Sequence, residues 1–459
     1  MLRYGFSYKF ISLLVALYEN SSLMVRAGGN CSPVMFSKTG VKQGCILSPI
    51  LFSIFLNDLF DIINSSGDGI EIDGVQIKIL AYADDIVILS DSVVGLQRLI
   101  DKLAIYLDEN GLKLNLNKSK IVVFRRGGKS ARADKWWFKG SPIQVVSNYK
   151  YLGVTFSSNG LFRMHYINKR THARLLINKI IQLGRSAKLR NLTDYLRLLK
   201  TVVLPSLLYA SEIWGFNMTN GDGIQIEFIK NLFYLPRCTP GYLIMMECAL
   251  TPIKFIIFSK IRNWITRIFN LDDYRLSKVC LKFILGKKSI DWTRYFIDTC
   301  NNHGINLIND DLNLMDWSLL LVNIFDNFLY NINEKINNSV YNCWYKDLNV
   351  TFFDNSLYNQ DVSLNILSLF IQARCNSLNF LNNYSRESCD FCVEKEIVDA
   401  WHILAKCKRL KVLRAEIFGC EVLTRGRDSS AINLALLLVL FGSICHCCIF
   451  VINLFLSYR

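Results

Sequence analysis

The stretch Tyr82-Ala83-Asp84-Asp85 lies between two short apolar runs, residues 77–81 and residues 86–89. Short runs rich in Ile and Val predict strands, and the two adjacent aspartates in the short break between them predict a tight hairpin turn. We therefore expect both carboxylates at a hairpin tip. Two carboxylates this close repel each other unless a cation lies between them or one is protonated. Mg²⁺ binds carboxylate oxygens together with substrate phosphates, as two-metal phosphoryl transfer requires. The alternative is a surface turn with two solvated aspartates, since Asp is common in turns.

Three other segments surround this hairpin in the sequence. Upstream, the Gly-flanked loop GVKQGCILSP begins at Gly40 and leads into an apolar run that predicts a helix, with Ser48 as N-cap and Pro49 in the first turn. Glycines in such a loop allow the backbone to approach a flat ligand closely. Downstream, GLKLNLNKSK begins at Gly111 and YKYLGV begins at Tyr149.

In this order and spacing, the four segments resemble the palm of reverse transcriptases, and most closely those of non-LTR retrotransposons, the LINE-like elements of the jockey and related groups. The resemblance implies an α+β fold, in which a partial right-hand polymerase palm of antiparallel sheet and helices precedes a mostly α-helical thumb and C-terminal region. It also implies an RNA-directed DNA polymerase that uses Mg²⁺ or Mn²⁺, an RNA template, a DNA primer or target, and deoxynucleotides.

The resemblance assigns a role to each segment. Asp84 and Asp85 would bind Mg²⁺ in the catalytic motif that also contains Tyr82. Lys42, Gln43 and Gly44 would contact the template and the incoming nucleotide, and Lys118 or Lys120 would face the triphosphate. The primer grip would be formed by Tyr151, Leu152 and Gly153.

The resemblance also indicates what is missing. In the family, a further catalytic aspartate lies on a palm strand upstream of the Gln-Gly loop, and residues 4–14 resemble the helix that follows this strand. The acidic residue ahead of the loop is Glu19, which lies in this helical stretch. Two-metal catalysis with Asp84 and Asp85 alone would be severely impaired. We therefore expect a truncated copy that is inactive alone; the alternative is a non-catalytic nucleic-acid-binding remnant.

The charge of the chain indicates an acidic partner. Its 459 residues include 53 Lys and Arg against 38 Asp and Glu, a net charge of +15. Residues 161–200 alone contain ten Lys or Arg and one acid, Asp194. Leucines and isoleucines interrupt this stretch at nearly helical spacing. It resembles the start of the thumb and would contact a nucleic-acid backbone; the alternative is a solvated helical face.

The cysteines and the apolar N-terminal segment indicate where in the cell the protein is found. The 15 cysteines are predicted to be mostly reduced core residues of an intracellular protein, nuclear or cytoplasmic or both. Residues 10–17 are apolar, but no small-residue cleavage pattern follows them. We expect these residues to form a buried helix.

Beyond Pro252 the chain contains no proline, which permits long helices. Residues 316–325 and 364–371 predict buried helices, and the Asn-rich stretches 301–304 and 337–339 predict the connections between helices.

A C-x₂-C pair followed by a histidine and a cysteine lies near the end of the chain. Its members are Cys389, Cys392, His402 and Cys407. Thiolates and imidazole at this spacing predict a closed tetrahedral Zn²⁺ site with a structural role. The pattern is similar to the zinc-binding motif that follows the reverse transcriptase domain in these elements. The alternative is chance, because a Cys-rich chain scatters C-x₂-C pairs.

Residues 434–456 are almost wholly apolar and exceed the length of about 18–20 residues that a membrane span requires. We favour a pair of buried helices over a membrane span. The sequence thus predicts five regions: a partial palm (1–156), a basic thumb-like region (157–270), an α-helical region (271–384), a zinc-knuckle-like motif (385–411) and an apolar helical tail (412–459).

Overall fold

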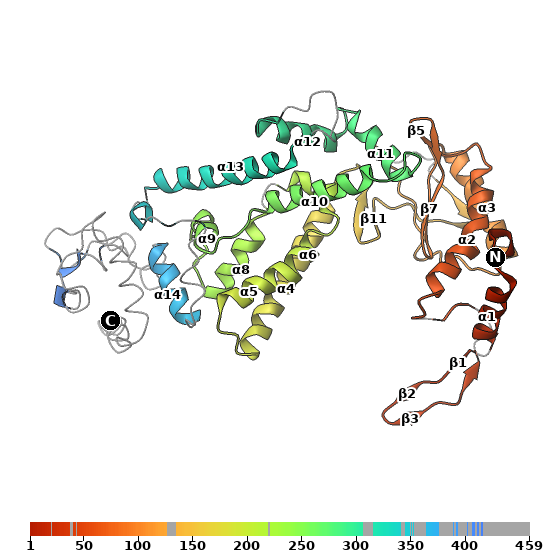
Figure 1. The fold of residues 1–459 in the computed structure, drawn as a ribbon, viewed down its shortest axis with the longest axis horizontal. Coiled ribbons are helices and arrows are strands. Elements are labelled where there is room, and N and C mark those ends of the chain that lie inside the picture. Colours follow the sequence, from red (N-terminus) through yellow and green to blue (C-terminus); the bar gives the residue numbers. More distant parts are fainter. Residues whose placement is uncertain are drawn as a thin grey trace. The chain divides into compact units, whose positions relative to one another are not determined.

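The computed structural model forms two compact units (Figure 1). The N-terminal unit comprises Met1–Lys150 and Phe156–Leu161, and the helical unit comprises Tyr151–Thr155 and Phe162–Arg459. The chain combines helices with small antiparallel sheets, so the predicted α+β class is confirmed. The structure describes residues 1–19, 21–36, 40–42, 44–125, 135–218, 221–305, 315–340, 345–348, 350, 352, 364–375, 389, 392, 402, 406–408, 411–412 and 415.

Strands of two to four residues form two-stranded antiparallel sheets in the first part of the chain. They are β1 (Ser22–Leu23) with β4 (Met35–Phe36), β2 (Arg26–Ala27) with β3 (Asn30–Cys31), β5 (Ile70–Ile72) with β6 (Val75–Ile77), β7 (Ile79–Tyr82) with β8 (Asp85–Ile88), β9 (Trp137–Phe138) with β10 (Ser141–Pro142), and β11 (Asn148–Tyr151) with β12 (Val154–Ser157). They are accompanied by the helices α1 (Tyr8–Glu19), α2 (Ser48–Asn64) and α3 (Val93–Glu109).

The core of the N-terminal unit lies between α2, α3 and the short strands. Leu59, Ile63 and Leu99 are completely buried and pack with Ile79 of β7. The Tyr106 hydroxyl on α3 donates a hydrogen bond to the Phe55 carbonyl on α2 at 3.0 Å. Helix α2 also packs against β7, and α3 against β8. The two helices therefore support both strands of the hairpin that ends in Asp84.

Two local predictions for this unit are wrong. Residues 10–17 are helical as part of α1, but Leu14 is the one buried residue of α1, and Leu13 is 63% exposed. An apolar segment can form a helix by its local preferences, whereas its burial depends on a partner surface.

Ser48 is also not the N-cap of α2, since Leu47 occupies that position and Ser48 is the first helical residue. The Ser48 hydroxyl donates instead to the Lys42 carbonyl at 2.6 Å.

The helical unit is built from α4 to α14. Their bounds are α4 (Arg163–Ser186), α5 (Leu192–Leu198), α6 (Leu204–Leu207), α7 (Ser211–Trp214), α8 (Gly223–Phe233), α9 (Gly241–Glu247), α10 (Ile253–Phe269), α11 (Leu276–Leu285), α12 (Asp291–Asn302), α13 (Trp317–Asn337) and α14 (Leu364–Arg374), with a π-helical turn at Leu199–Val203 and 3₁₀ turns at Gly215–Asn217 and Tyr345–Leu348. Helices α13 and α14 contain the two predicted helical runs, and α12 and α13 end at the predicted Asn-rich connections, so the helices and connections are confirmed. The predicted burial of the first run is incomplete, since Leu319 and Val322 of α13 are exposed.

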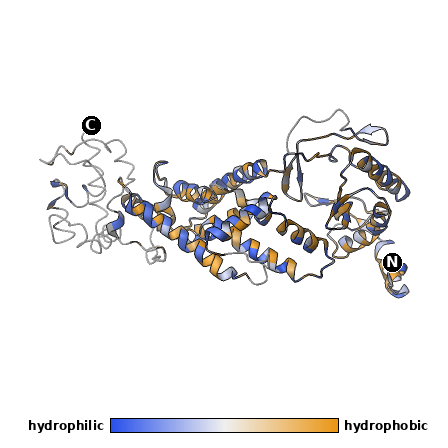
Figure 2. Ribbon diagram, turned by 90° about the horizontal axis from the view of Figure 1, so that it is seen from above, coloured by the Kyte–Doolittle hydropathy of each residue, from blue (hydrophilic) through white to orange (hydrophobic). Residues whose placement is uncertain are grey.

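One continuous apolar core joins the helices of this unit. It extends from Ala173 and Ile177 on α4 through Phe228 on α8 to Phe370 on α14. Hydrophobic and hydrophilic residues alternate around the helices, as amphipathic helices around a core require (Figure 2). Among the residues that the structure describes, no helix is long and apolar enough to cross a membrane. The apolar run 434–456 lies outside the described residues.

Candidate active site and metal centre

The predicted carboxylate hairpin forms, with a shift of one residue. Strands β7 and β8 pair so that Tyr82 lies opposite Asp85, which leaves Ala83 and Asp84 as the two-residue turn. Asp85 is thus the first residue of β8 rather than part of the turn. Tyr82, Asp84 and Asp85 are all exposed, Tyr82 at 67%. The two carboxylates lie at the solvent-facing end of a hairpin whose other end is packed on helices.

The turn contains a strained residue. Ala83 has φ 53°, the left-handed region in which a Cβ costs roughly 1–2 kcal/mol. The turn between β5 and β6 is also two residues long but uses Asp73 and Gly74, both at positive φ. Two-residue hairpin turns have a positive φ at the first central position, so the turn geometry itself accounts for the conformation of Ala83.

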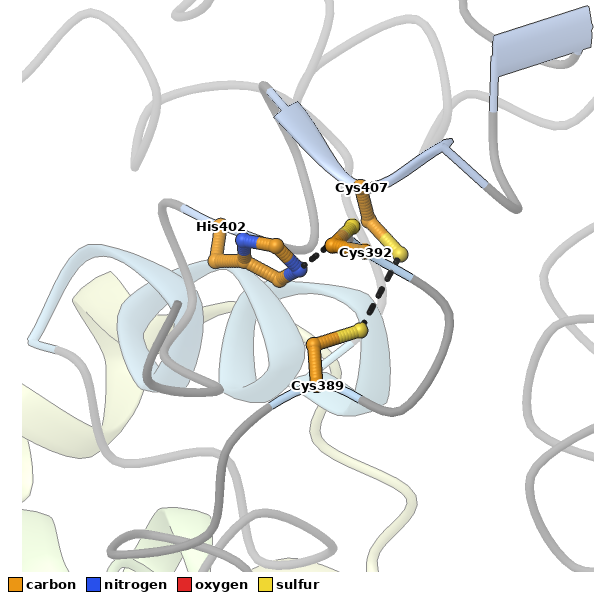
Figure 3. Close-up of side chains that lie close together, drawn as sticks. All are labelled: Cys389, Cys392, His402 and Cys407. Atoms are coloured by element: carbon orange, nitrogen blue, oxygen red, sulfur yellow. Dashed lines mark hydrogen bonds between the residues drawn. The ribbon is translucent and has the colours of Figure 1, made fainter. Parts of the chain in front are cut away.

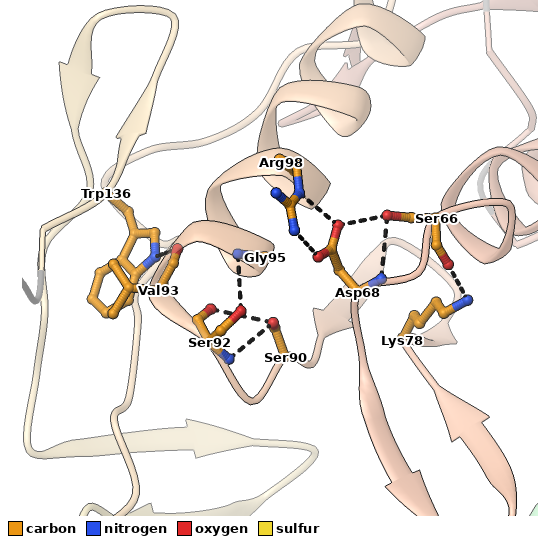
Figure 4. Close-up of polar contacts among 9 residues, drawn as sticks. All are labelled: Ser66, Asp68, Lys78, Ser90, Ser92, Val93, Gly95, Arg98 and Trp136. Carbon is orange, nitrogen blue, oxygen red and sulfur yellow. Dashed lines mark hydrogen bonds and ion pairs between the residues drawn. The ribbon is translucent and has the colours of Figure 1, made fainter.

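A network of polar contacts anchors the base of the hairpin (Figure 4). Lys78, directly before β7, is 6% exposed, and its ammonium donates to the Asn64 carbonyl at 2.8 Å and to the Ser66 carbonyl. These carbonyls lie at the C-terminus of α2, where a cation interacts favourably with the helix dipole. Asp68 accepts hydrogen bonds from Ser66 and from Arg98 on α3. The hairpin base is thus tied to both supporting helices.

The Asp68–Arg98 contact predicts an acid-sensitive stability. The hydrogen bond from Arg98, and then that from Ser66, hold the pKa of the Asp68 carboxyl well below its usual range. A lowered folded-state pKa contributes stability above the unfolded value of about 4, which is lost as the pH falls below it. Thermal melts should therefore show an Asp68→Asn variant less stable than wild type at neutral pH, with the difference shrinking below about pH 4. A difference in stability between the two chains that does not change with pH would contradict this prediction. The control is Asp108→Asn, which replaces an exposed carboxylate.

The loop predicted to contact template and nucleotide is held by the end of α1. The Lys42 ammonium donates to the Leu17 carbonyl at 2.8 Å and lies 5.6 Å from the centre of the Tyr18 ring. The Tyr18 hydroxyl lies 3.2 Å from the Ser48 hydroxyl. These contacts fix both sides of the loop, and Gly44 has φ 81°. Gln43 lies outside the described residues.

The lysine-bearing segment and the YKYLGV segment meet in the N-terminal unit. The Tyr149 hydroxyl on β11 donates to the Lys118 carbonyl at 3.0 Å, and Ile121 forms a parallel bridge with Val145. Lys118 lies in a turn closed by Asn115, and Lys120 directly precedes Ile121. The two segments are therefore neighbours, although the paired residues are 24 and 31 positions apart in the sequence.

The Tyr151-Leu152-Gly153 segment forms the tip between β11 and β12. Leu152 and Gly153 have φ of 44° and 82°, the signs that a type I′ hairpin turn needs at both central positions. Residues Tyr151–Thr155 belong to the helical unit, although both strands begin or end in the N-terminal unit. The predicted primer grip is therefore carried by the helical unit.

The four predicted zinc ligands lie together and are all buried (Figure 3). Their ligand atoms fall within 4.8 Å of one another. The Cys389 and Cys407 sulfurs are 3.9 Å apart, and the Cys392 sulfur lies 3.6 Å from Nε2 of His402. Zinc bonds of about 2.3 Å to sulfur and about 2.0 Å to nitrogen place tetrahedral ligand atoms roughly 3.5–3.8 Å apart. The cluster therefore has the donors and the spacing to hold a metal ion.

Neighbouring atoms suit a metal thiolate. The Lys408 amide points at the Cys392 sulfur at 3.5 Å, as amides do toward a charged sulfur ligand. The ten cysteines of the described residues are all free of disulfides. Cys389, Cys392 and Cys407 belong to the same apolar core as the helices from α4 to α14.

Helix α4 has an unusual charge pattern. Its 24 residues include six Lys or Arg and no acid. Arg174 forms an ion pair with Glu227 of α8, in which both side chains are partly exposed. Leu175 and Leu183 are 57% and 67% exposed on the same helix, whereas Ile177 and Ile181 face the core. The predicted amphipathic basic helix therefore forms, with two of its leucines outside the core.

Several anchoring side chains were not predicted from the sequence. They are Tyr18, Lys78, Tyr149, His165 and Tyr209, and each bonds a segment that is distant in the chain. A lysine between two apolar residues at position 78 is a weak local signal of burial with a partner. The other four have no local signal, because tyrosines and histidines are common in both cores and surfaces.

Comparison with known proteins shows which family this part of the chain resembles. Residues 8–156, the segment that contains the carboxylate hairpin and the Lys42 loop, match the family described as reverse transcriptase (RNA-dependent DNA polymerase). Together with the relatives described below, this match confirms the predicted resemblance to LINE-like reverse transcriptases of non-LTR retrotransposons.

Three relatives show how far the similarity extends. The RNA-directed DNA polymerase from mobile element jockey of Drosophila funebris is 27% identical over 215 residues, 45% of this chain and 23% of the relative. A Pol polyprotein from type-1 retrotransposable element R2 of Popillia japonica is 27% identical over 235 residues, 49% and 37% of the two chains. The Pol polyprotein from type-2 retrotransposable element R2DM of Drosophila melanogaster is 30% identical over 167 residues, which are 35% of this chain and 16% of the relative. The matches span well under half of each relative.

Proposed function

We propose that this chain is part of an RNA-directed DNA polymerase that extends a DNA primer on an RNA template. The observation that carries the proposal is the pair Asp84 and Asp85, exposed at the tip of a supported hairpin within the segment that matches reverse transcriptases. Adjacent hard carboxylates suit Mg²⁺, which bound there would neutralise the charge that develops on the transferring phosphoryl group. The β7–β8 pairing and the α2 and α3 supports would hold these two carboxylates in place for the metal.

The other predicted residues take binding roles in this proposal. Lys42 to Gly44 would contact the template and the incoming deoxynucleotide, and Lys118 or Lys120 would pair with the triphosphate. The turn Tyr151 to Gly153 would position the primer. Their support is the set of contacts that hold each segment: Leu17 and Tyr18 for the first, Tyr149 for the second.

We further propose the division of the chain. Residues 1–156 would form a partial palm, 157–270 a basic thumb-like region and 271–384 an α-helical region, with a zinc knuckle at 385–411. The acid-free helix α4 supports the thumb, because basic residues along a helix follow a phosphate backbone. Zn²⁺ held by Cys389, Cys392, His402 and Cys407 would be structural, since four protein ligands leave no open position. The tail 412–459 lies almost wholly outside the described residues.

Primer extension on a primed RNA template with Mg²⁺ or Mn²⁺ tests the polymerase proposal. We expect little or no extension by the chain alone. Any extension that is measured should fall at least about a hundredfold in Asp84→Asn, because loss of a metal ligand removes several kcal/mol of transition-state stabilisation and about 1.4 kcal/mol is tenfold. Asp73→Asn is the matched control, since Asp73 occupies the turn of the neighbouring β5–β6 hairpin. Measurable extension that is equal in wild type and Asp84→Asn would contradict the assignment.

The second candidate is nucleic-acid binding without polymerisation, which the charge of α4 favours. It predicts that the chain binds primed RNA with an affinity that falls steeply with salt, yet extends no primer. If the wild-type chain extends a primer and Asp84→Asn does not, this second candidate is excluded. The same result would show that the chain is active alone, contrary to the expectation from its sequence. Absence of binding at low salt would exclude both candidates.

A further inference from the structure

The turn Tyr151 to Gly153 is held by a side chain far downstream. The Tyr209 hydroxyl donates a hydrogen bond to the Leu152 carbonyl at 3.0 Å. The ring of Tyr209 lies directly against the glycine, since a Cβ on Gly153 would be 2.9 Å from Cε1 of that ring. Gly153 is thus required both by its φ of 82° and by the close approach of Tyr209.

Tyr209 is itself fixed from two sides. The Lys169 ammonium on α4 lies 4.8 Å from the centre of the Tyr209 ring, a cation–π contact. The indole of Trp214 on α7 donates to the Tyr209 carbonyl at 2.9 Å. Ring, hydroxyl and backbone of this one residue are therefore all engaged, although its side chain remains near the surface at 47% exposure.

The strand that leaves the turn is bound by the same group of residues. Nδ1 of His165, the third residue of α4, accepts a hydrogen bond from the Thr155 amide at 3.0 Å. His165 is 1% exposed, and its ring lies edge-on to Trp214 with 4.8 Å between ring centres. The turn is thus attached through Tyr209 to the residues just before α7, and the strand that leaves it is attached through His165 to the start of α4.

We propose that Tyr209 is a positioning residue for the Leu152–Gly153 turn: its hydroxyl sets the orientation of the peptide that this turn presents to a bound nucleic-acid strand. The inference rests on the proposed function, in which the turn contacts the primer. A trans peptide is planar, so a fixed Leu152 carbonyl directs the Gly153 N–H to the opposite side. The hydroxyl therefore controls a backbone donor that no side chain of the turn can replace.

Tyr209→Phe tests the proposal, because it removes the hydroxyl and keeps the ring against Gly153 and beneath Lys169. In the free chain, the amides of residues 151–155 should exchange about fivefold faster, as expected for the loss of one hydrogen bond worth about 1 kcal/mol. With a primed RNA template that carries 2-aminopurine at the primer 3′ end, the fluorescence change on binding should be lost, while the affinity changes less than about twofold, since the rest of the duplex is held elsewhere. Tyr295→Phe is the control, because Tyr295 also lies beneath a cation, Arg294.

The outcomes separate this inference from the proposed function. Faster exchange together with a lost 3′-end signal supports it. A variant that binds the duplex with an unchanged 3′-end signal overturns the inference and leaves the proposed function intact, even if exchange is faster, because Tyr209 would then be only structural. A wild-type chain that does not bind the duplex overturns the proposed function, and the inference with it.

Discussion

Wild type is expected to purify with one zinc ion, and a Cys407→Ser chain is expected to purify without it and to unfold far more easily. Structural zinc sites contribute about 10–16 kcal/mol of apparent binding free energy at neutral pH. The ligands Cys389, Cys392 and Cys407 lie in the same apolar core as Phe370 and Ile371 of α14. Loss of the ion would leave buried thiols and an imidazole without their shared partner. We therefore expect a loss of several kcal/mol that spreads into the helical unit.

Metal analysis and urea unfolding, with and without a chelator, measure this effect. Cys238→Ser is the matched control, because Cys238 is exposed and outside the cluster. It should retain about one zinc and the wild-type stability. Full zinc content in Cys407→Ser, or a chelated wild type that unfolds at the same urea concentration, would refute the structural metal centre.

Glu247→Gln is expected to destabilise the helical unit by about 3–5 kcal/mol, the usual cost of breaking a buried ion pair by removal of one partner. The Glu247 side chain at the end of α9 is 1% exposed and lies 2.9 Å from Nε of Arg374, itself 6% exposed. The Tyr345 hydroxyl donates to the same carboxylate at 2.6 Å. Burial, and then the Glu247 charge, raise the pKa of Tyr345 well above its usual range, so the phenol stays protonated and keeps donating. Glutamine would leave the Arg374 cation uncompensated.

Urea unfolding of three variants tests this pair. Glu227→Gln breaks a partly exposed ion pair with Arg174 and should cost at most about 1 kcal/mol. The double variant Glu247→Gln, Arg374→Met should recover part of the loss, because no buried charge is then unpaired. If Glu247→Gln and Glu227→Gln had the same small effect, the buried network would not stabilise the fold.

The predictions from sequence hold where a short pattern decides the structure. The β7–β8 hairpin follows from two β-branched runs with a short break between them, although the turn is Ala83-Asp84 rather than the two aspartates. The group of candidate metal ligands follows from residue types at fixed spacing, because this spacing allows the side chains of Cys389, Cys392, His402 and Cys407 to meet at one point. The helices α13 and α14 follow from apolar runs without proline.

The predictions are wrong, or cannot be made, where contacts with residues distant in the sequence determine the structure. The apolar pattern of α1 predicts a helix correctly and its burial wrongly, because burial requires a second surface. Ser48 has the side chain of an N-cap, but the Lys42 carbonyl accepts its hydrogen bond instead. Tyr209 and Lys78 each satisfy a backbone carbonyl that local sequence does not specify.

The attachment of the Leu152–Gly153 turn to Tyr209 and of Thr155 to His165 has a consequence for how such chains can be recombined. The segment that matches the family ends at residue 156, so a chimaera joined there looks natural in sequence. It would nevertheless pair a turn from one parent with anchors from the other. Elements that exchange their reverse transcriptase segments would have to exchange the stretch up to Trp214 as one block. The segment that must be inherited together is therefore longer than the segment that matches the family.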